Sequence, residues 1–317
     1  MRITASVAAL ALLVCATNAE AQLKGHYIPG FTGLQNGTQP PPGISLAVPW
    51  YHYPTNTIKD DDGKTLPAHA EITADFIGVA LMWVTNKKLL GGNLGGSIVP
   101  VSYIKSRIET NSLDVPGSLA FTDIEVQPLW LGWNTARADY SASYAFFAPT
   151  GKWELGGSDN AGLGMWSHDL QVGSTVRLDN RNAWTTSALA TFEVHTHKKD
   201  TQLRAGNILT LEGGTGRSFY KKIPGSPVPR IVTVGLAYYG QFKVSGDAGL
   251  SPSGTAALAK IQDRVYGVGG EASVLLPKLN LLLDLRVIPE FGARTRTQGV
   301  TYLFSVGYEL KSLAKPH

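Results

Sequence analysis

The chain has 317 residues, enough for one large all-β domain or two ordinary ones. Charged residues make up only 16% of it, below the roughly 25% usual for soluble domains, and glycine is abundant at 35 residues. The net charge is +4 without a basic cluster beyond three Lys–Lys pairs, which argues against nucleic acid as a partner. No internal stretch reaches the roughly 18 apolar residues of a membrane helix. Low charge without such a helix favours a β-barrel.

Residues 1–21 have the pattern of a secretory signal peptide. Arg2 supplies the positive charge, residues 3–17 form a short and mostly apolar run, and Ala19-Glu20-Ala21 is an A-x-A cleavage site. The only cysteine, Cys15, lies within this segment. A lipoprotein acylated at Cys15 is the alternative, although Val14 is bulkier than the small residue usually found before such a cysteine. A mature chain without cysteine must be held by its packing and its sheet alone.

Residues 22–42 form a Gly- and Pro-rich segment that has no clear periodicity and ends in the run Pro40-Pro41-Pro42. A proline run cannot form a helix or an inner strand. We expect this segment to be either a periplasmic tail or a plug folded into the lumen of the barrel.

Residues 43–310 contain twelve strand candidates, each bounded by turn residues. They are expected at 43–57, 69–85, 93–108, 121–133, 137–148, 166–178, 183–197, 204–220, 231–245, 263–276, 281–296 and 300–310. Residues 311–317 follow as a polar C-terminal tail. Twelve is an even number, as bacterial single-chain barrels require. The fold class predicted is all-β, a closed antiparallel transmembrane β-barrel of about 12 strands.

Alternation of apolar and polar residues is clearest in the last two strands. From Val300 to Leu310 the apolar side chains occupy every second position, with Leu303 as the one apolar residue on the other face. The fourth strand places Ile124, Val126, Pro128 and Trp130 on one face. Successive side chains of a strand point to opposite faces of the sheet. Broad aromatic faces opposite charged faces indicate hydrocarbon outside the barrel and a polar lumen inside.

Connections between the expected strands alternate in length. Residues 134–135, 179–182 and 277–280 are tight turns, whereas 113–120, 149–165 and 246–262 are long. Outer-membrane barrels have short periplasmic turns and longer external loops. With both chain ends at the periplasmic side, the long loops face outside. Residues 221–230 are long for a periplasmic turn.

Polar residues on the alternating strands are the candidates for lining the lumen. They are Asp123, Glu125, Gln127, Asp169, Glu193, His195, His197, Gln241, Lys243, Glu271, Asp284, Arg286, Glu290, Arg294 and Arg296. They could form a charged constriction that selects permeants. They could instead pair with one another, close the lumen and stiffen the barrel. The second interpretation is favoured, because twelve strands lie between the filled eight-stranded barrels and the open porins.

Two groups raise the question of chemistry. Glu193, His195 and His197 share one strand face, and the two imidazoles could reach one metal ion if a neighbouring strand supplied a third ligand. A polar lining near the external rim is the alternative, and we predict neither a metal nor a cofactor. Ser167, His168 and Asp169 are adjacent on a strand, point to alternate faces and cannot form a triad. No enzymatic activity is predicted, although other Ser, His and Asp residues could meet across strands.

Three stretches carry a family resemblance. They are Phe121-Thr122-Asp123-Ile124-Glu125-Val126-Gln127-Pro128 running to Leu131-Gly132-Trp133, then Phe147-Ala148-Pro149-Thr150-Gly151-Lys152-Trp153, and Asn160-Ala161-Gly162-Leu163-Gly164-Met165-Trp166. Together they resemble the MetA-pathway of phenol degradation family. The resemblance implies an exported outer-membrane barrel that imports aromatic or other hydrophobic compounds, and it carries over no catalytic residues.

These observations predict a passive outer-membrane channel for small hydrophobic or aromatic compounds in a Gram-negative bacterium, after cleavage near Ala21. Its expected partners are the solute, outer-membrane lipid and the outer-membrane assembly machinery. The aromatic residue that this machinery recognises would be Phe304 or Tyr308, upstream of the polar tail. Three alternatives stay open. They are a structural or adhesive barrel with a sealed lumen, a barrel lipid hydrolase, and a soluble periplasmic β-protein.

Overall fold

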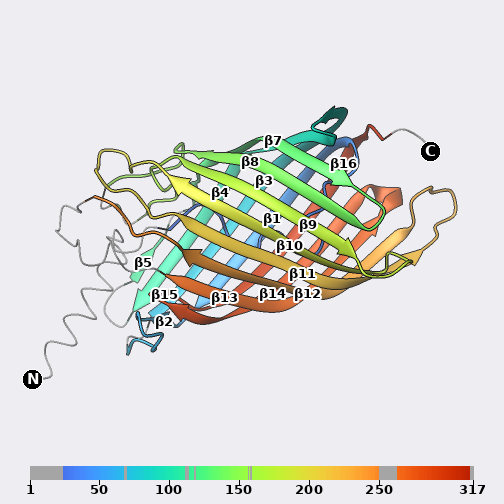
Figure 1. The fold of residues 1–317 in the computed structure, drawn as a ribbon. Helices are drawn as coiled ribbons and strands as arrows, with labels where there is room; N and C mark the ends of the chain where they lie inside the picture. Colours follow the sequence, from blue (N-terminus) through green and yellow to red (C-terminus); the bar gives the residue numbers. More distant parts are fainter. Residues whose placement is uncertain are drawn as a thin grey trace, which may run out of the picture.

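The computed structural model describes residues 24–314, apart from 68–69, 111–113, 118, 156, 158 and 250–262. The predicted signal peptide, most of the connection at 246–262 and the last three residues of the tail therefore lie outside the described residues. Within the described part, twelve long strands form the wall (Figure 1). They are β1 (Gly43–Thr55), β3 (Ala70–Leu89), β4 (Gly92–Thr110), β7 (Ile124–Asn134), β8 (Ala138–Ala148), β9 (Ser167–Arg177), β10 (Trp184–His195), β11 (Ile208–Lys221), β12 (Arg230–Lys243), β13 (Arg264–Leu276), β14 (Leu281–Arg294) and β16 (Val300–Ser312).

The sheet closes on itself. Each long strand pairs with the next long strand in the chain, and β1 also pairs with β16, so that the first and last strands complete the ring. All of these pairings are antiparallel. This confirms the predicted fold class and the predicted twelve strands.

Four shorter strands lie outside this ring. β5 (Asp114–Pro116) and β6 (Ala120–Phe121) extend the pairing of β4, while β2 (Ile58–Lys59) pairs with β15 (Arg296–Thr297). Figure 1 shows β2, β5 and β15 gathered at one end of the barrel. Among the described residues, no helix has the length and apolar character needed to cross a bilayer.

The two ends of the barrel differ in their connections. One end, called the short-turn end, carries 90–91, 135–137, 178–183, 222–229 and 277–280. The opposite end, called the long-loop end, carries 56–69, 111–123, 149–166, 196–207 and 244–263. The tightest turn joins β3 to β4, where Leu90 and Gly91 both have positive φ. Two central residues with positive φ are typical of the hairpin turn that matches the twist of the strands.

Side-chain alternation in β16 follows the predicted pattern. Tyr302, Phe304, Tyr308 and Leu310 are exposed on the outside, whereas Leu303, the apolar exception, is buried inside. Exposed aromatic and aliphatic side chains cover the outer wall as a lipid-facing surface requires.

Among the register irregularities of the sheet, two bulges change the alternation of residues singled out in the sequence. In β14 an extra residue at Gly292, which has a φ of 62°, moves Arg294 into register with the outward-facing Arg264. In β7 a bulge at Pro128 brings Trp130 into register with the inward-facing Ser143. Proline cannot donate to the ladder and is placed at such bulges. The expectation that Trp130 shares the outer face of Ile124 and Val126 was therefore wrong.

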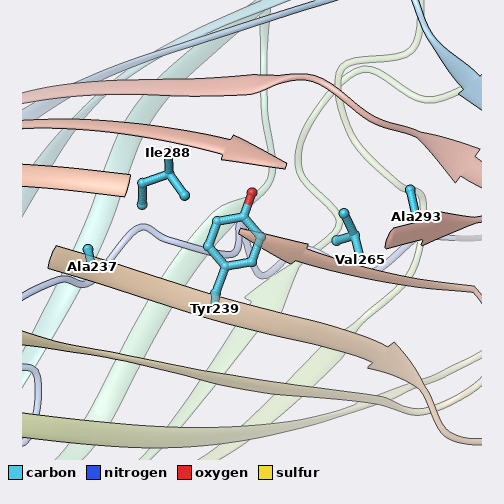
Figure 2. Close-up of a cluster of buried hydrophobic side chains, with 5 residues drawn as sticks. All are labelled: Ala237, Tyr239, Val265, Ile288 and Ala293. Atoms are coloured by element: carbon cyan, nitrogen blue, oxygen red, sulfur yellow. The ribbon is translucent and has the colours of Figure 1, made fainter. Parts of the chain in front are cut away.

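The interior also contains an apolar cluster. Ala237, Tyr239, Val265, Ile288 and Ala293 are buried together on inward-facing positions of the wall, or beside it (Figure 2). We expected polar residues alone to line the lumen, and this apolar cluster departs from that expectation. It packs against residue Gly30, where an added Cβ would meet the Tyr239 ring and the Ile288 side chain.

Candidate functional site in the barrel lumen

Residues 24–42, called the lumen segment below, run along the inside of the barrel. At the long-loop end His26 contacts Asp123 and Ser167, and near the short-turn end Thr38 Oγ1 donates to Asp139 at 2.9 Å. The segment then enters β1 at Gly43, which pairs with Ser312. We expected both ends of the mature chain at the short-turn end. That expectation is wrong for the N-terminal side, because the segment crosses the lumen before the first strand begins.

Glu212 on β11 is the main contact of the lumen segment. Its carboxylate accepts hydrogen bonds from Tyr27 Oη at 2.5 Å, from the backbone N–H of Gly30 at 2.7 Å and from Thr32 Oγ1. Its backbone carbonyl accepts a further bond from Asn36 Nδ2 at 3.1 Å. The side chain is almost completely buried. A single carboxylate thus satisfies three donors of the segment in a water-poor interior, where leaving them unpaired would be costly.

An ion-pair group continues these contacts on β13 and β14. Arg286 Nε lies 2.8 Å from Glu271 Oε2, and Arg286 Nη2 lies 2.9 Å from Asp284 Oδ1. The same guanidinium donates to the backbone carbonyl of Phe31 at 2.5 Å, and Glu271 accepts the backbone N–H of Leu34 at 2.9 Å. Charge pairing inside the lumen and attachment of the segment therefore use the same residues.

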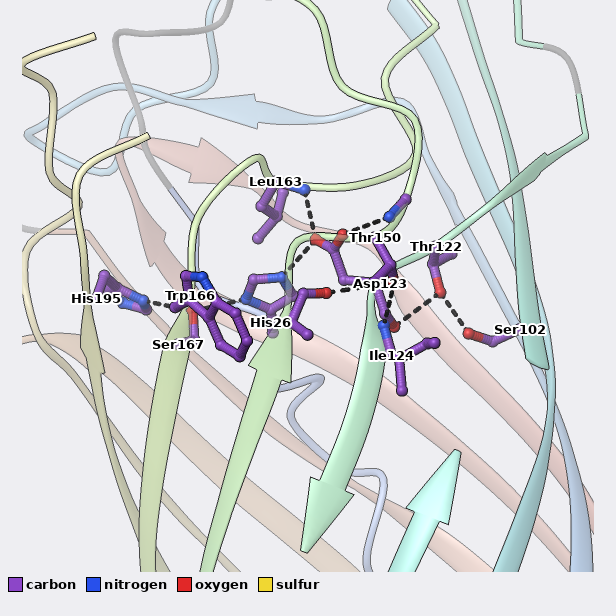
Figure 3. Close-up of polar contacts among 12 residues, drawn as sticks. His26, Ser102, Thr122, Asp123, Ile124, Thr150, Leu163, Trp166, Ser167 and His195 are labelled. Atoms are coloured by element: carbon purple, nitrogen blue, oxygen red, sulfur yellow. Dashed lines mark hydrogen bonds and ion pairs between the residues drawn. The ribbon is translucent and has the colours of Figure 1, made fainter. Parts of the chain in front are cut away.

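At the long-loop end His26 is the centre of a polar network (Figure 3). Its Nε2 lies 2.7 Å from Asp123 Oδ2, its Nδ1 lies 2.6 Å from Ser167 Oγ, and its backbone N–H donates to Glu193 Oε1 at 2.6 Å. Ser167 Oγ also lies 2.8 Å from His195 Nδ1. The imidazole stacks on Phe147 with ring centroids 4.6 Å apart. Polar and aromatic contacts together fix the start of the described segment.

Asp123 joins this network to an external loop. Its carboxylate accepts the backbone N–H groups of Gly151 and Leu163 at 2.8 and 2.7 Å. Burial would raise the pKa of Asp123, but the hydrogen bonds from His26, Leu163 and Gly151 hold it below its ordinary value. An ionised carboxylate here therefore ties the loop after β8 to the lumen segment.

The order Asp123, His26, Ser167 is that of an acid, a base and a nucleophile, and the sequence left this possibility open. In the structure Ser167 is fully buried and its hydroxyl is shared between two imidazoles. Among the described residues, the surroundings of that oxygen leave it no exposed surface. The geometry supports attachment of His26 to the wall rather than attack on an ester.

A third group lies near the long-loop rim. Arg296 Nη1 donates to Gln241 Oε1 at 3.0 Å and lies 3.6 Å from Asp263 Oδ1, while Gln241 Nε2 donates to the backbone carbonyl of Tyr27 at 3.2 Å. Lys243 Nζ lies 2.9 Å from Asp247 Oδ1. Glu290 accepts Tyr53 Oη at 2.5 Å and Tyr239 Oη at 2.9 Å. These pairs match the interpretation in which lumen charges neutralise one another.

Most of the predicted lumen residues are buried in the structure, and the remainder are not. Eleven are buried: Asp123, Asp169, Glu193, His195, Gln241, Lys243, Glu271, Asp284, Arg286, Glu290 and Arg296. Glu125 and Gln127 are half-buried on inward-facing positions of β7. His197 and Arg294 are exposed. β10 ends at His195, so His197 lies beyond the strand, and the bulge at Gly292 turns Arg294 outward. The proposed sharing of one face by Glu193, His195 and His197 is therefore not realised.

Sequence reasoning missed several contributors. Glu212 and Asp139 lie inside strands that were expected, and Glu212 follows the alternation set by Thr210 on an irregular strand. That period-two position was the signal that could have identified it. His26 and Tyr27 lie in a segment without periodicity, so no pattern pointed to them. Within the described part of the chain, no group of three His, Cys, Asp or Glu side chains is arranged to hold a metal ion.

The middle of the wall from β4 to β9 has a different character, although the lumen segment contacts β8 and β9 nearer their ends. Its inward-facing Ser97, Gln127, Ser143 and Gln171 keep partial exposure, whereas the inward-facing carboxylates Glu193, Glu212 and Glu271 are buried. Ser143 Oγ donates to Gln171 Oε1 at 2.9 Å, and Gln127 Nε2 lies 3.5 Å from the same oxygen. Amides, a hydroxyl and the half-buried Trp130 thus line the less crowded side of the lumen.

A closed twelve-stranded wall with a polar interior is the fold of outer-membrane channels. The crystal structure of the COG4313 outer membrane channel from Pseudomonas putida F1 superposes with a TM-score of 0.67 at 13% identity, over 89% of this chain and 99% of that chain. The beta domain of the Bordetella autotransporter BrkA superposes with a TM-score of 0.50 at 10% identity, over 84% and 100%. No match is found among the curated proteins.

Residues 55–306 match the family model described as MetA-pathway of phenol degradation. The match covers most of the chain, which therefore belongs to this family. This confirms the resemblance carried by the three motif stretches.

Proposed function

We propose that this protein is a passive outer-membrane channel for small hydrophobic or aromatic compounds. Family membership and the channel fold support the proposal. The observation that carries it is the uneven filling of the lumen. The segment contacts inward residues of β10–β14 and, nearer the strand ends, of β8 and β9, while Ser97, Gln127, Ser143 and Gln171 keep partial exposure. A solute would move along that less crowded side.

The proposed location is the outer membrane of a Gram-negative bacterium, reached after signal-peptide cleavage near Ala21. Short turns lie on the periplasmic side of such barrels and longer loops outside. We therefore place the short-turn end in the periplasm, with the lumen segment starting at the external side. Insertion of the barrel would need the outer-membrane assembly machinery, and its outer wall would contact lipid.

In this proposal the lumen segment acts as a plug that narrows the channel. Its donors are met by Glu212, Glu271 and the His26 network, so it has many fixed contacts. The remaining side of the lumen offers the half-buried ring of Trp130 together with the amides of Gln127 and Gln171. Aromatic faces favour aromatic solutes, and amides can bond a polar substituent without holding it strongly. Weak binding of this kind allows a solute both to enter and to leave.

Deletion of residues 24–41 tests the plug directly. This deletion leaves β1 intact, because the strand begins at Gly43. Conductance in planar bilayers should rise and become less selective, since the contacts to Glu212 and Glu271 are lost. Thr215→Ala, an outward change on β11, is the matched control and should leave conductance as in the parent chain. An unchanged conductance in the deleted chain would count against the plug.

Liposome swelling separates the channel from a sealed structural barrel. Vesicles carrying the parent chain should swell in phenol-sized solutes faster than empty vesicles, whereas a sealed barrel would give no difference. A barrel hydrolase is the second alternative, suggested by the Asp123–His26–Ser167 order. Its test is ester hydrolysis by the detergent-solubilised protein: activity abolished by Ser167→Ala would favour an enzyme over a channel.

A further inference from the structure

One arginine faces the lipid side of the wall. Arg217 on β11 is in register with Trp184 on β10 and with Val234 on β12. Residues paired across antiparallel strands point to the same face, and both of these partners are exposed on the outer wall. The guanidinium carbon lies 5.6 Å from the centroid of the Trp184 ring and 4.9 Å from that of the Phe219 ring. Two aromatic rings therefore hold the arginine in place.

Among the residues that the structure describes, no carboxylate forms an ion pair with Arg217, whose contacts are the two rings. A cation on the lipid face of a barrel is costly near the bilayer centre and tolerated near the interface. β11 ends at Lys221 and β10 begins at Trp184, so Arg217 lies close to the short-turn end. An anionic group at the interface would satisfy it.

A depression lies beside the arginine. It has a volume of about 470 Å³ and is lined by Trp184, Thr215, Arg217, Phe219, Val234 and Leu236 together with two backbone glycine positions. Its lining is almost entirely apolar except for Arg217 and the Thr215 hydroxyl, which bonds to Thr186 at 2.9 Å. Gly216 and Gly235, which lie on the lumen-facing positions between these outward residues, contribute only backbone to its floor. The depression is thus an apolar furrow with one cation, Arg217, at its edge.

We propose that Arg217, Trp184 and Phe219 form a binding site for one phospholipid of the leaflet at the short-turn end. The lipid phosphate lies on the Arg217 guanidinium, and an acyl chain fills the depression beside Thr215 and Leu236. A guanidinium presents a planar set of donors that matches phosphate oxygens, which distinguishes it from a lysine. Trp and Phe at this level belong to the interfacial aromatic belt, where lipid headgroups lie.

Other outward cations at this end lack the same surroundings. Arg230, the first residue of β12, is in register with Lys221, the last residue of β11. Neither residue lines the depression. Arg230→Gln therefore removes an outward positive charge nearby without touching the proposed site. It is the matched control for Arg217→Gln.

The test measures lipid binding by the full chain, purified in detergent and stripped of lipid. Palmitoyl-oleoyl phosphatidylglycerol is titrated, and native mass spectrometry counts the bound molecules. Arg217→Gln should weaken retention of the first lipid about tenfold or more, because a charge-assisted bond is lost. Arg230→Gln should bind as the parent chain does. Thr215→Leu, which fills the furrow and leaves Arg217 intact, should also weaken binding.

Diacylglycerol with the same acyl chains is the control that distinguishes phosphate recognition from non-specific hydrophobic binding. It should not be retained. Equal binding by Arg217→Gln and the parent chain, by Thr215→Leu and the parent chain, or by diacylglycerol and phosphatidylglycerol would overturn the site. The channel proposal is tested separately, since Arg217 lies outside the lumen and Arg217→Gln should leave solute flux unchanged. Loss of lipid binding with normal flux would support the site alone.

Discussion

Removal of the Glu212 carboxylate is the sharpest perturbation of the lumen segment. Glu212→Ala would leave the hydroxyl of Tyr27, the N–H of Gly30 and the hydroxyl of Thr32 without their acceptor. Each hydrogen bond to a charged group contributes about 1.5–3 kcal/mol. Part of this is offset, because the carboxylate loses its own hydration when the segment covers it. Three such bonds at the low end of that range sum to about 4.5 kcal/mol, and after this offset we expect attachment of the segment to weaken by about 3 kcal/mol.

A change of that size alters the equilibrium between attached and released segment by about 100-fold. Single-channel recording in planar bilayers measures it as more frequent openings to the larger conductance of the chain lacking residues 24–41. Thr215→Ala, three residues along the same strand and facing outward, serves as the control. The barrel should stay folded in both variants, as checked by the shift in gel mobility on heating. Opening frequencies that match between Glu212→Ala and Thr215→Ala would refute the reasoning.

Three further predictions concern packing, orientation and charge. Gly37→Ala should release the end of the segment near the short-turn end and raise conductance, because a Cβ at Gly37 would overlap the backbone of Ser174, whereas Gly270→Ala has open space and should change nothing. Cys15 is the only cysteine of the sequence, and our proposal removes it with the signal peptide. On that basis Lys64→Cys in a long loop should react with an impermeant maleimide on intact cells and Lys278→Cys only after permeabilisation; the reverse would invert the orientation. Among the described residues, nine acidic side chains are buried but only three Lys or Arg side chains. Reversal potentials should therefore favour K⁺ over Cl⁻, and Glu125→Gln should reduce that preference. Anion selectivity would contradict the charge argument.

The alternation of apolar and polar residues predicted most of the strands of the barrel. In β14 and β16 most apolar residues face lipid, with Ile288 and Leu303 as inward exceptions. The pattern alone placed Asp284, Arg286 and Glu290 correctly in the interior. The reason is physical: a charged side chain is costly where a strand faces hydrocarbon and is readily accommodated where it faces a polar lumen. Turn residues then fixed the connections, as Gly91 did between β3 and β4.

The positions that could not be predicted depend on interruptions of that period. A bulge adds one residue to one strand, which exchanges the faces of everything beyond it. Pro128 and Gly292 were visible in the sequence, but either residue can also occupy an ordinary strand or turn position. The side chains of Trp130 and Arg294 consequently lie on the faces opposite to those expected.

Contacts of the lumen segment were hidden for a different reason. A segment without regular structure has no repeating pattern, and its partners are set by which wall residues lie opposite it in three dimensions. Glu212 and Glu193 receive donors from residues more than 160 positions away in the chain. The sequence therefore indicated that a polar Gly-rich segment could enter the lumen, but not where it would bind.

The composition of the segment becomes intelligible once its position is known. Buried backbone N–H groups need acceptors, and the segment forms no sheet ladder of its own, so carboxylates of the wall accept the N–H groups of His26, Gly30 and Leu34. Close approach to those carboxylates leaves no room for a Cβ at Gly25 beside Glu193 or at Gly33 beside Glu271. Glycine in the segment and acidic residues on the wall are thus one arrangement. A substitution on either side should loosen the same contact, and a paired Gly33→Ala and Glu271→Ala change should cost less attachment than the two single effects added together, because both act on one interaction.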